Sequence, residues 1–211
     1  MPTIEQARGW YPDMDAVHGF DHVLRVYAMA ERLAEAEGAD LEIVRAAALL
    51  HDVEGSLPGS DDRPNHHHQS ADFAAQVLAA EGWSKERIAA VQHCIRAHRY
   101  RSDGERPQTL EAQVLFDADK LDVLGAIGAA RTIAYAVIAG TPIHAVPSAR
   151  FLASGEEEPG ELHSAYHEYL FKLRHVKARL HTPAALKIAE QRDAALRDFF
   201  EQLDAEMRGE R

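Results

Sequence analysis

A histidine–aspartate pair closes a strongly apolar segment of the chain. His51 and Asp52 follow the run AAALL (46–50) and come shortly before Gly55. Imidazole and carboxylate groups hold divalent metal ions or transfer protons. Adjacent residues of a helix point about 100° apart, so both side chains can reach one ion only near a helix end. Taken alone, the pair favours a core histidine with a neighbouring carboxylate over a metal site.

Three aspartates lie inside another apolar segment, LFDADKLDVLG (115–125). Asp119 and Asp122 are three residues apart and share one face of a helix. Burying an ionised carboxylate is costly unless a cation or hydrogen-bond donors compensate it. The aspartates therefore indicate either a metal site or ion pairs with arginines such as Arg25 or Arg131.

His22 borders the apolar stripe of a helix that the spacing predicts over residues 15–37. Read singly, it is as typical of a half-buried histidine as of a metal ligand. Two imidazoles and two carboxylates from three apolar helices form a mixed nitrogen and oxygen shell. Such a shell suits Mn²⁺, Fe²⁺, Zn²⁺, Co²⁺ or Ni²⁺ and leaves room for water or a substrate oxygen.

The elements that must position these residues are all predicted to be helices. Apolar residues recur at spacings of three and four, and no strand-like alternation, repeat, GxGxxG or Walker sequence is present. The predicted helices span residues 15–37, 41–52, 70–80, 85–99, 110–139, 161–180 and 183–207, and residues 141–160 read as irregular. We predict an all-α, multi-helix bundle that forms a single domain over 1–211, with a core at about 15–140 and a helical extension at about 160–207.

Composition limits the functional classes. The 211 residues are 46% hydrophobic and carry a net charge of −11, which argues against a nucleic-acid partner. No apolar run approaches the roughly 20 residues of a membrane span, and the first residues lack signal-peptide features, so we expect a cytoplasmic protein. Cys94 is the only cysteine, which excludes an internal disulfide and a thiolate cluster. We expect Cys94 in the core.

His22, the His51–Asp52 pair and Asp119 resemble the metal positions of the HD-domain metal-dependent phosphohydrolases. Surrounding segments resemble a bacterial subgroup of small stand-alone members: HGFDHVLRV (18–26), AALLHDV (47–53), HHHQSADFA (66–74), LEAQVLFDADKLDVLGAIGAAR (110–131) and TPAALKIAEQR (182–192). The resemblance covers nearly the whole chain. It implies an all-α fold and hydrolysis of phosphate esters or nucleotide anhydrides, and it leans to nucleoside triphosphates.

The resemblance also implies roles for individual residues. His22, His51, Asp52 and Asp119 would hold one divalent ion (Mn, Fe, Co, Ni, Zn or Mg, with Mn favoured). Asp119 is preferred to Asp117 because family members carry the last aspartate directly before a lysine or arginine. Such an ion lowers the pKa of a bound water from near 16 towards roughly 7. The predicted substrate contacts are Lys120, Arg25, His66, His67, His98 and Arg131.

The match to the family weakens just after the HD pair. Several relatives place a catalytic acidic residue three positions after the aspartate, where this chain has Gly55. Glu54 comes one residue early, and Asp61 or Asp62 could come in from the following loop. We expect Asp52, Lys120 and Glu54 to be the catalytic residues.

Further histidines leave other functions open. His66, His67, His68, His93 and His98 fall between Asp52 and Asp119, and two of them could hold a second metal, as in a di-iron oxygenase of the same fold. The altered segment at Glu54 leaves a non-catalytic nucleotide-binding module as another alternative.

In the C-terminal third, His163 and His167 are four residues apart and could also coordinate a metal, although a solvated helix face is favoured. The same holds for positive charge from Lys172, Arg174 and Lys177 near a phosphate. The expected partner is a small phosphorylated molecule, a nucleotide by resemblance, with no nucleic acid and no membrane. A homodimer is compatible with the sequence.

Overall fold

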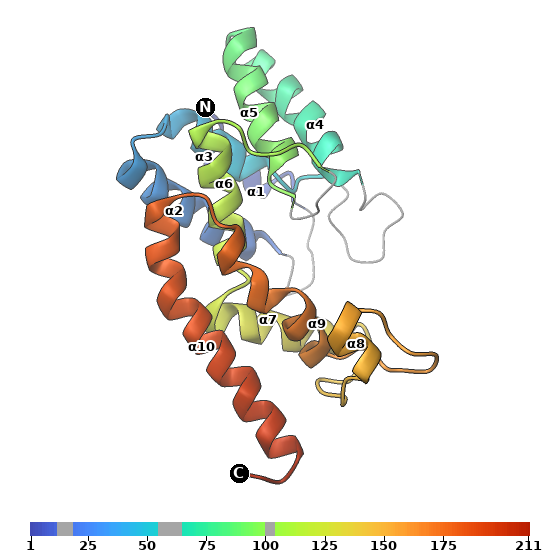
Figure 1. Ribbon diagram of the computed structural model, residues 1–211. Helices are drawn as coiled ribbons and strands as arrows, with labels where there is room; N and C mark the ends of the chain where they lie inside the picture. The colour runs from blue at the N-terminus through green and yellow to red at the C-terminus, as the bar shows by residue number, and fades with distance from the viewer. Residues whose placement is uncertain (12–18, 55–64, 100–103) are drawn as a thin grey trace. The chain divides into compact units, whose positions relative to one another are not determined.

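The computed structural model describes residues 1–11, 19–54, 65–99 and 104–211. Every regular element in these ranges is helical, so the predicted all-α class is confirmed (Figure 1). The α-helices are α1 (Ile4–Arg8), α2 (Phe20–Glu37), α3 (Leu41–Leu50), α4 (His66–Ala80), α5 (Lys85–Ala97), α6 (Leu110–Leu121), α7 (Gly125–Ile138), α8 (Ala149–Ser154), α9 (Ala165–Phe171) and α10 (Pro183–Met207). Two 3₁₀ helices, η1 (Leu173–His175) and η2 (Lys177–Arg179), follow α9.

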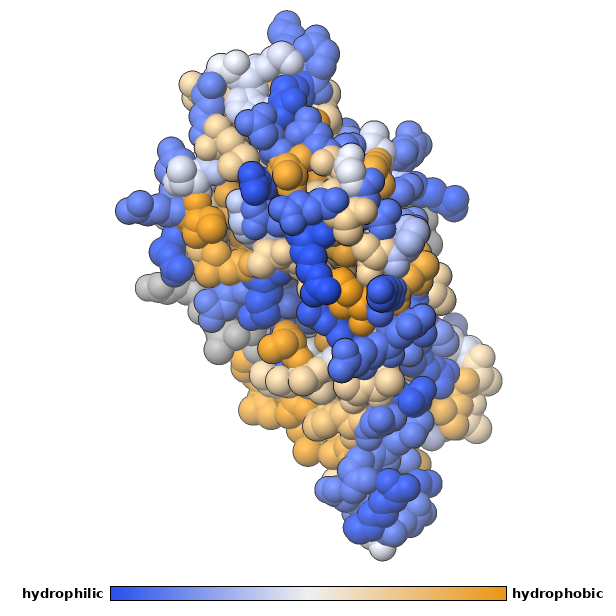
Figure 2. Space-filling view, turned by 90° about the vertical axis from the view of Figure 1, so that its left-hand side faces the viewer, coloured by the Kyte–Doolittle hydropathy of each residue, from blue (hydrophilic) through white to orange (hydrophobic). Residues whose placement is uncertain are grey.

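The helices form two compact units. Unit 1 comprises Met1–Lys120 and Leu180–Ala185, and unit 2 comprises Leu121–Arg179 and Leu186–Arg211. In the space-filling view, most of the visible surface is hydrophilic, with hydrophobic residues gathered in patches (Figure 2). That distribution is expected for a chain of net charge −11, because charged residues stay at the surface and most apolar residues are buried in the core.

Unit 1 is built around the apolar helix α3. This helix packs against α2, α4 and α5, and α4 and α5 lie side by side (Figure 1). The Asp40 side chain caps α3 by accepting from the backbone N–H groups of Glu42 and Ile43, as the sequence predicted. Residues 46–50 are almost fully buried. The buried apolar run therefore places the His51–Asp52 pair at the C-terminal end of α3, next to the core.

Polar contacts at the N-terminal end of α3 fix its neighbours. The Asp40 backbone N–H donates to Glu111 on α6 at 3.1 Å, and Arg87 on α5 donates to Asp40 at 3.1 Å and to Glu42 at 2.8 Å. These contacts tie α3, α5 and α6 together about 15 Å from the HD pair, since a helix rises about 1.5 Å per residue. Cys94 on α5 is fully buried, as expected.

The prediction of a single helix over 110–139 is wrong in its length, because the segment breaks into α6 and α7 at residues 122–124. Gly125 has φ +71°, a left-handed conformation that other residues rarely adopt. A Cβ on Gly128 would lie 2.2 Å from the Val123 carbonyl oxygen. The glycines therefore allow a tight turn of the backbone where α7 begins.

Other boundaries differ from the prediction as well. Helix α4 begins at His66 rather than at residue 70, and α8 lies within 141–160, where no helix was expected. The helix predicted over 161–180 is instead α9 followed by η1 and η2. Helix α10 spans 183–207, as predicted.

Unit 2 contains His163 and His167, and carboxylates contact both of them. His167 is fully buried, with Nε2 at 3.1 Å from Glu161 Oε1, and His163 Nδ1 lies 2.7 Å from Glu157. Glu161 also accepts backbone N–H groups from Ser148 and Glu158, each at 2.7 Å. Among the described residues, these two histidines are not part of a metal-type cluster.

Within the described ranges, no single helix has the length and apolar composition to cross a membrane. Helices α6 and α7 meet those criteria only when they are taken together as a bent pair.

Candidate metal centre

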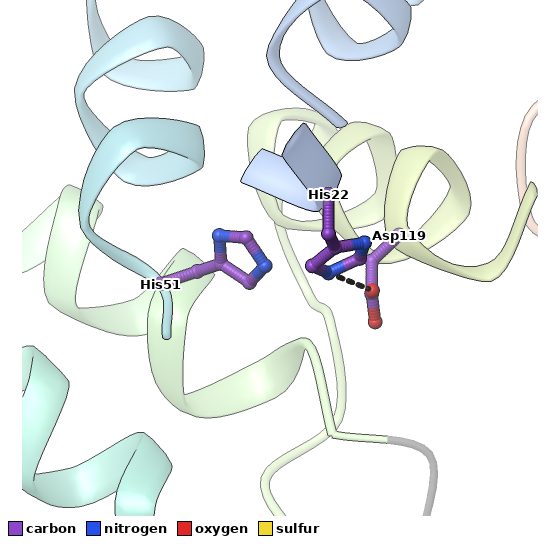
Figure 3. Close-up of side chains that lie close together, drawn as sticks. All are labelled: His22, His51 and Asp119. Carbon is purple, nitrogen blue, oxygen red and sulfur yellow. Dashed lines mark ion pairs between the residues drawn. The ribbon is translucent and has the colours of Figure 1, made fainter. Parts of the chain in front are cut away.

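Three helices of unit 1 bring His22, His51 and Asp119 together (Figure 3). His22 lies in the first turn of α2, His51 directly follows α3, and Asp119 lies near the end of α6. One ligand atom of each residue lies within 4.8 Å of the others, and His22 Nε2 is 3.4 Å from Asp119 Oδ1. His22 and His51 are buried, so their imidazoles are largely shielded from bulk water.

Asp52 completes the group. Its Oδ2 lies 3.6 Å from His51 Nε2 and 3.9 Å from His22 Nε2. These separations are longer than a normal hydrogen bond. They match ligand atoms that each lie about 2 Å from one ion, because such atoms are about 3–4 Å apart. The structure thus brings His22, His51 and Asp119 together and places Asp52 beside both imidazoles.

Two buried polar atoms of the His51–Asp52 pair have no hydrogen-bond partner: His51 Nε2, which lies near Asp52 Oδ2, and Asp52 Oδ1, which faces His66 and His98 instead. His51 Nδ1 donates to the Ala48 carbonyl oxygen at 2.8 Å, which leaves Nε2 as the free lone pair. Each unsatisfied buried polar group costs about 1–3 kcal/mol. A cation bound at His51 Nε2 would offset that cost for the first of these atoms, so the donor set of His22, His51, Asp119 and Asp52 Oδ2 fits a divalent ion.

The ionisation of the cluster also suits a cation. Burial lowers the pKa of His51 to about 4, so its imidazole is neutral at pH 7. Burial alone would raise the pKa of Asp52, but the neighbouring imidazoles of His51, His66 and His98 outweigh burial and lower it well below its usual value. Burial is likewise outweighed at Asp119, whose pKa is lowered mainly by the charge of Lys120. Neutral imidazoles and ionised carboxylates are the states that bind metals.

A second group of possible ligands shares Asp52. His66 Nε2 and His98 Nε2 lie 3.4 Å and 3.3 Å from Asp52 Oδ1, and the three residues form a metal-type cluster of their own. His98 Nδ1 donates to the Ile95 carbonyl oxygen and so directs Nε2 towards Asp52. Asp52 therefore presents Oδ2 to one group and Oδ1 to the other.

Lys120 contacts the cluster through an ion pair with Asp119. Its Nζ lies 2.6 Å from Asp119 Oδ2 and 5.3 Å from the centre of the Phe116 ring. Lys120 is 8% exposed. Asp119 thus directs one oxygen to His22 and the other to a cation of its own helix.

The remaining predicted residues of unit 1 lie at different distances from this centre. Arg25 is half-buried on α2, one turn after His22. His67 is buried beside His66, and its Nδ1 has no hydrogen-bond partner. The pKa of His67 is lowered to about 4, and burial is the main cause. Glu54 is exposed, and its backbone N–H donates to Ser70 Oγ at 3.1 Å.

Other predicted residues lie elsewhere. Asp61 and Asp62 fall outside the described residues. Arg131 belongs to unit 2, where its Nη1 lies 2.6 Å from Asp122. The arginine ion pair that the sequence offered as an alternative is therefore formed at Asp122, and the metal-type arrangement is formed at Asp119.

Sequence reasoning missed two residues that position the centre. The Tyr11 hydroxyl donates to the Leu49 carbonyl oxygen at 3.0 Å, just before the HD pair. Asp117 accepts hydrogen bonds from the backbone N–H groups of His181 and Thr182 and from the Thr182 hydroxyl, at 2.7–3.1 Å. A Thr-Pro pair at the start of α10 is a helix-start signal that could have suggested a buried partner there. No periodic pattern singles out Tyr11.

This chain is similar to known proteins in both sequence and fold. Residues 19–124 match the HD domain family. The chain is 30% identical to the uncharacterized protein YpgQ of Bacillus subtilis over 99% of this chain and 96% of that protein. A crystal structure of YpgQ in complex with ADP has a TM-score of 0.73, at 29% identity, and the match covers 99% of this chain and 100% of that one.

A further solved structure is an HD-superfamily hydrolase from Bacillus thuringiensis. It has a TM-score of 0.71 at 27% identity, and the match covers 97% of this chain and 94% of that one. The matched segment of the family contains His22, the His51–Asp52 pair and Asp119. The chain therefore belongs to the HD domain family.

Proposed function

We propose that this protein is a metal-dependent phosphohydrolase that acts on nucleotides and holds one divalent ion, with Mn²⁺ favoured, between His22, His51, Asp52 and Asp119. The observation that carries the proposal is the convergence of these side chains around the buried, unpaired Nε2 atom of His51. The hydrolase relative from Bacillus thuringiensis supports the reaction class, and the ADP complex of YpgQ supports a nucleotide ligand.

The residues around the ion would divide the work between them. The ion would supply a water-derived nucleophile at neutral pH and polarise a phosphoryl oxygen. Asp52 and Asp119 hold the negative charge that retains the cation, and Lys120 offsets charge on the phosphate chain. Arg25, His66, His67 and His98 would contact the substrate. A local cation and a lysine can attract phosphate even in a chain of net charge −11.

Hydrolysis of a nucleotide panel tests this proposal. The panel contains nucleoside mono-, di- and triphosphates, each assayed with Mn²⁺, Mg²⁺, Co²⁺, Ni²⁺, Zn²⁺ and Fe²⁺. We expect phosphate or pyrophosphate release in the wild type and a loss of at least about 100-fold in Asp52→Ala. Asp72→Ala, on the exposed side of α4, is the matched control and should keep full activity. The proposal is wrong if no metal gives turnover or if Asp52→Ala is unchanged.

Lys120 is tested separately because it could act on substrate or only on Asp119. If Lys120 contacts the phosphate chain, Lys120→Met lowers kcat/KM by about 100-fold, while the protein still binds one equivalent of metal. Loss of metal binding together with activity would instead make Lys120 a positioning residue for Asp119.

The two faces of Asp52 favour a second candidate, a di-iron oxygenase on the same fold. Its Oδ1 lies near His66 and His98, so a second ion could be bound there. This candidate predicts two metal equivalents per chain and consumption of O₂. Elemental analysis that finds one equivalent or less excludes it. Nucleotide binding without turnover would instead favour a non-catalytic module, for which the exposed Glu54 is the motivation.

A further inference from the structure

The start of α10 is joined to α6 through one buried carboxylate, that of Asp117. Its Oδ1 accepts the backbone N–H of His181 at 2.9 Å, and its Oδ2 accepts the backbone N–H and the hydroxyl of Thr182, each at 2.7 Å. Asp117 is fully buried and Thr182 is 1% exposed, so bulk water does not compete for these hydrogen bonds. Three donors on one carboxylate leave it little freedom to move.

The same segment also contacts the preceding residue of α6, Phe116. The His181 ring lies edge-on to the Phe116 ring, with 5.0 Å between the ring centres. Lys120 Nζ lies 5.3 Å from the centre of that Phe116 ring. Residues 181 and 182 therefore contact α6 at positions 116 and 117, about one turn before the Asp119–Lys120 ion pair.

Asp117 and Asp119 point to opposite sides of α6, because side chains two residues apart on a helix differ by about 200° in direction. Asp117 faces the start of α10, and Asp119 faces His22 (Figure 3). The contacts at Asp117 therefore set the rotation of α6 about its own axis. On a helix roughly 10–12 Å across, a rotation of about 10° moves a side-chain tip by about 1 Å. Metal–ligand distances vary by only about 0.2 Å, so this rotation decides whether Asp119 reaches the ion.

The segment that holds Asp117 lies outside the part of the chain that matches the HD domain family. The match ends at residue 124, yet Leu180–Ala185 belong to unit 1. We propose that Thr182 is a positioning residue of the metal centre, which acts through Asp117 to fix the rotation of α6 and to direct Asp119 at the ion. This inference rests on the proposed function, because it needs the metal site, although it does not need the nucleotide substrate.

Calorimetric titration of the full chain with Mn²⁺ tests the proposal through two substitutions at one position. Thr182→Val keeps the shape of the side chain but removes the hydroxyl, and we expect the Mn²⁺ dissociation constant to rise about 10-fold, as is typical when a group behind a ligand is lost. Thr182→Ser keeps the hydroxyl and loses only a methyl group, so its dissociation constant should stay within about twofold of the wild type. A role in packing alone would give the opposite order.

Glu37→Ala is the matched control, because Glu37 of α2 also holds the start of α10. Its Oε1 accepts the Ala184 backbone N–H at 2.7 Å, whereas the Asp117 contacts go to His181 and Thr182. This variant should bind Mn²⁺ as the wild type does. Unchanged Mn²⁺ affinity in Thr182→Val overturns the proposal, and so does an equal loss of affinity in Thr182→Ser or in Glu37→Ala.

The titration contains no nucleotide, so its result is separate from that of the hydrolysis assay. Absence of hydrolysis in a wild type that binds Mn²⁺ would overturn the proposed function without changing the dissociation constants expected here. Unchanged Mn²⁺ affinity in Thr182→Val would overturn this inference alone, because the hydrolytic activity of the wild type would stand.

Discussion

At the scale of residues, the candidate metal centre depends on how each imidazole is turned. His51 is directed by the Ala48 carbonyl oxygen and His98 by the Ile95 carbonyl oxygen, so in both rings Nδ1 donates and Nε2 faces Asp52. Backbone partners of this kind fix the tautomer and the direction of a metal ligand. Tyr11 adds a third constraint, because its hydroxyl holds the Leu49 carbonyl oxygen next to the HD pair.

Tyr11→Phe removes only this hydroxyl. We expect the free energy of unfolding to fall by about 1 kcal/mol, and the metal dissociation constant to rise about 10-fold, because the end of α3 is less well held. Urea unfolding and calorimetric titration with Mn²⁺ measure the two effects.

The control for Tyr11→Phe is Tyr169→Phe, in which the same atom is removed from a buried ring that stacks on Phe200 in unit 2. That variant should bind Mn²⁺ as the wild type does. Unchanged Mn²⁺ affinity in Tyr11→Phe would limit Tyr11 to a structural role.

The types of the site residues could be predicted from the sequence, but their orientation could not. His22, His51, Asp52 and Asp119 stand out because polar groups in apolar helices need a reason to be there. The Ala48 and Ile95 carbonyls are backbone atoms, and any residue could supply them. The second group at His66 and His98 also depended on a convergence in three dimensions that spacing does not reveal.

At the scale of elements, Asp117 shows how α6 is joined to the start of α10. It is fully buried and accepts three kinds of hydrogen bond from His181 and Thr182, all within unit 1. Burial is the main influence on Asp117 and raises its pKa above its ordinary value, although the donated hydrogen bonds act in the opposite direction. The end of α6 is therefore fixed by hydrogen bonds at Asp117, two residues before Asp119.

Asp117→Asn replaces one acceptor oxygen by an amide that donates. We expect it to lower the free energy of unfolding by about 2–4 kcal/mol, because at least one buried donor is left without a partner. Urea unfolding measures the change. Asp72→Asn on the exposed side of α4 should alter stability by less than about 0.5 kcal/mol. A similarly small change at Asp117 would contradict the proposed anchor.

Gly128→Ala tests the tight turn at the start of α7. Alanine favours a helix by about 1 kcal/mol over glycine, yet here its Cβ would lie 2.2 Å from a backbone oxygen of Val123. We expect steric overlap to outweigh propensity and to destabilise the protein by at least about 2 kcal/mol, measured as a lower thermal midpoint.

Gly9→Ala is the control for that substitution, because its added Cβ would be 3.4 Å from the nearest atom and its φ is negative. It should be neutral or slightly stabilising. A stabilising Gly128→Ala would mean that the backbone before α7 shifts readily to make room for the added Cβ.

The break between α6 and α7 shows the limit of periodicity. Leu121, Val123 and Leu124 continue the apolar pattern, so the pattern gives no sign of a stop. Only Gly125 and Gly128 mark the place. The bounds of α10 were predictable because Pro183 starts the helix in a position where its missing N–H is harmless. The 3₁₀ helices η1 and η2 each span three residues, which is too short for a hydrophobic period to show in the sequence.

At the scale of the whole molecule, pH should act on unit 2 through its histidine–carboxylate pairs. Burial alone would raise the pKa of Glu168, but His163 and Lys172 lower it to about 2. Glu168 hydrogen bonding raises the pKa of His163. The folded-state pKa of Glu168 is below its ordinary value, so its contribution to stability is present above pH 4.5 and is lost as pH falls towards 2.

Glu168→Gln removes this contribution. The variant should be less stable than the wild type by about 1 kcal/mol at pH 6, and the difference should shrink towards zero as pH falls from 4.5 to 2. It should also shrink when pH rises through the raised pKa of His163, because the imidazole then loses its charge. Urea unfolding at a series of pH values gives both limbs. A difference that does not change with pH would exclude the ion pair as its cause.

The central claim is that one cation is bound by four side chains. They are His22 of α2, His51 and Asp52 at the end of α3, and Asp119 of α6. Anomalous diffraction from crystals grown with Mn²⁺ tests it most directly. We predict one strong anomalous peak about 2.0–2.3 Å from His22 Nε2, His51 Nε2 and oxygens of Asp52 and Asp119. No peak among these atoms at saturating Mn²⁺, or a peak that leaves His22 or Asp119 out of contact, would contradict the account.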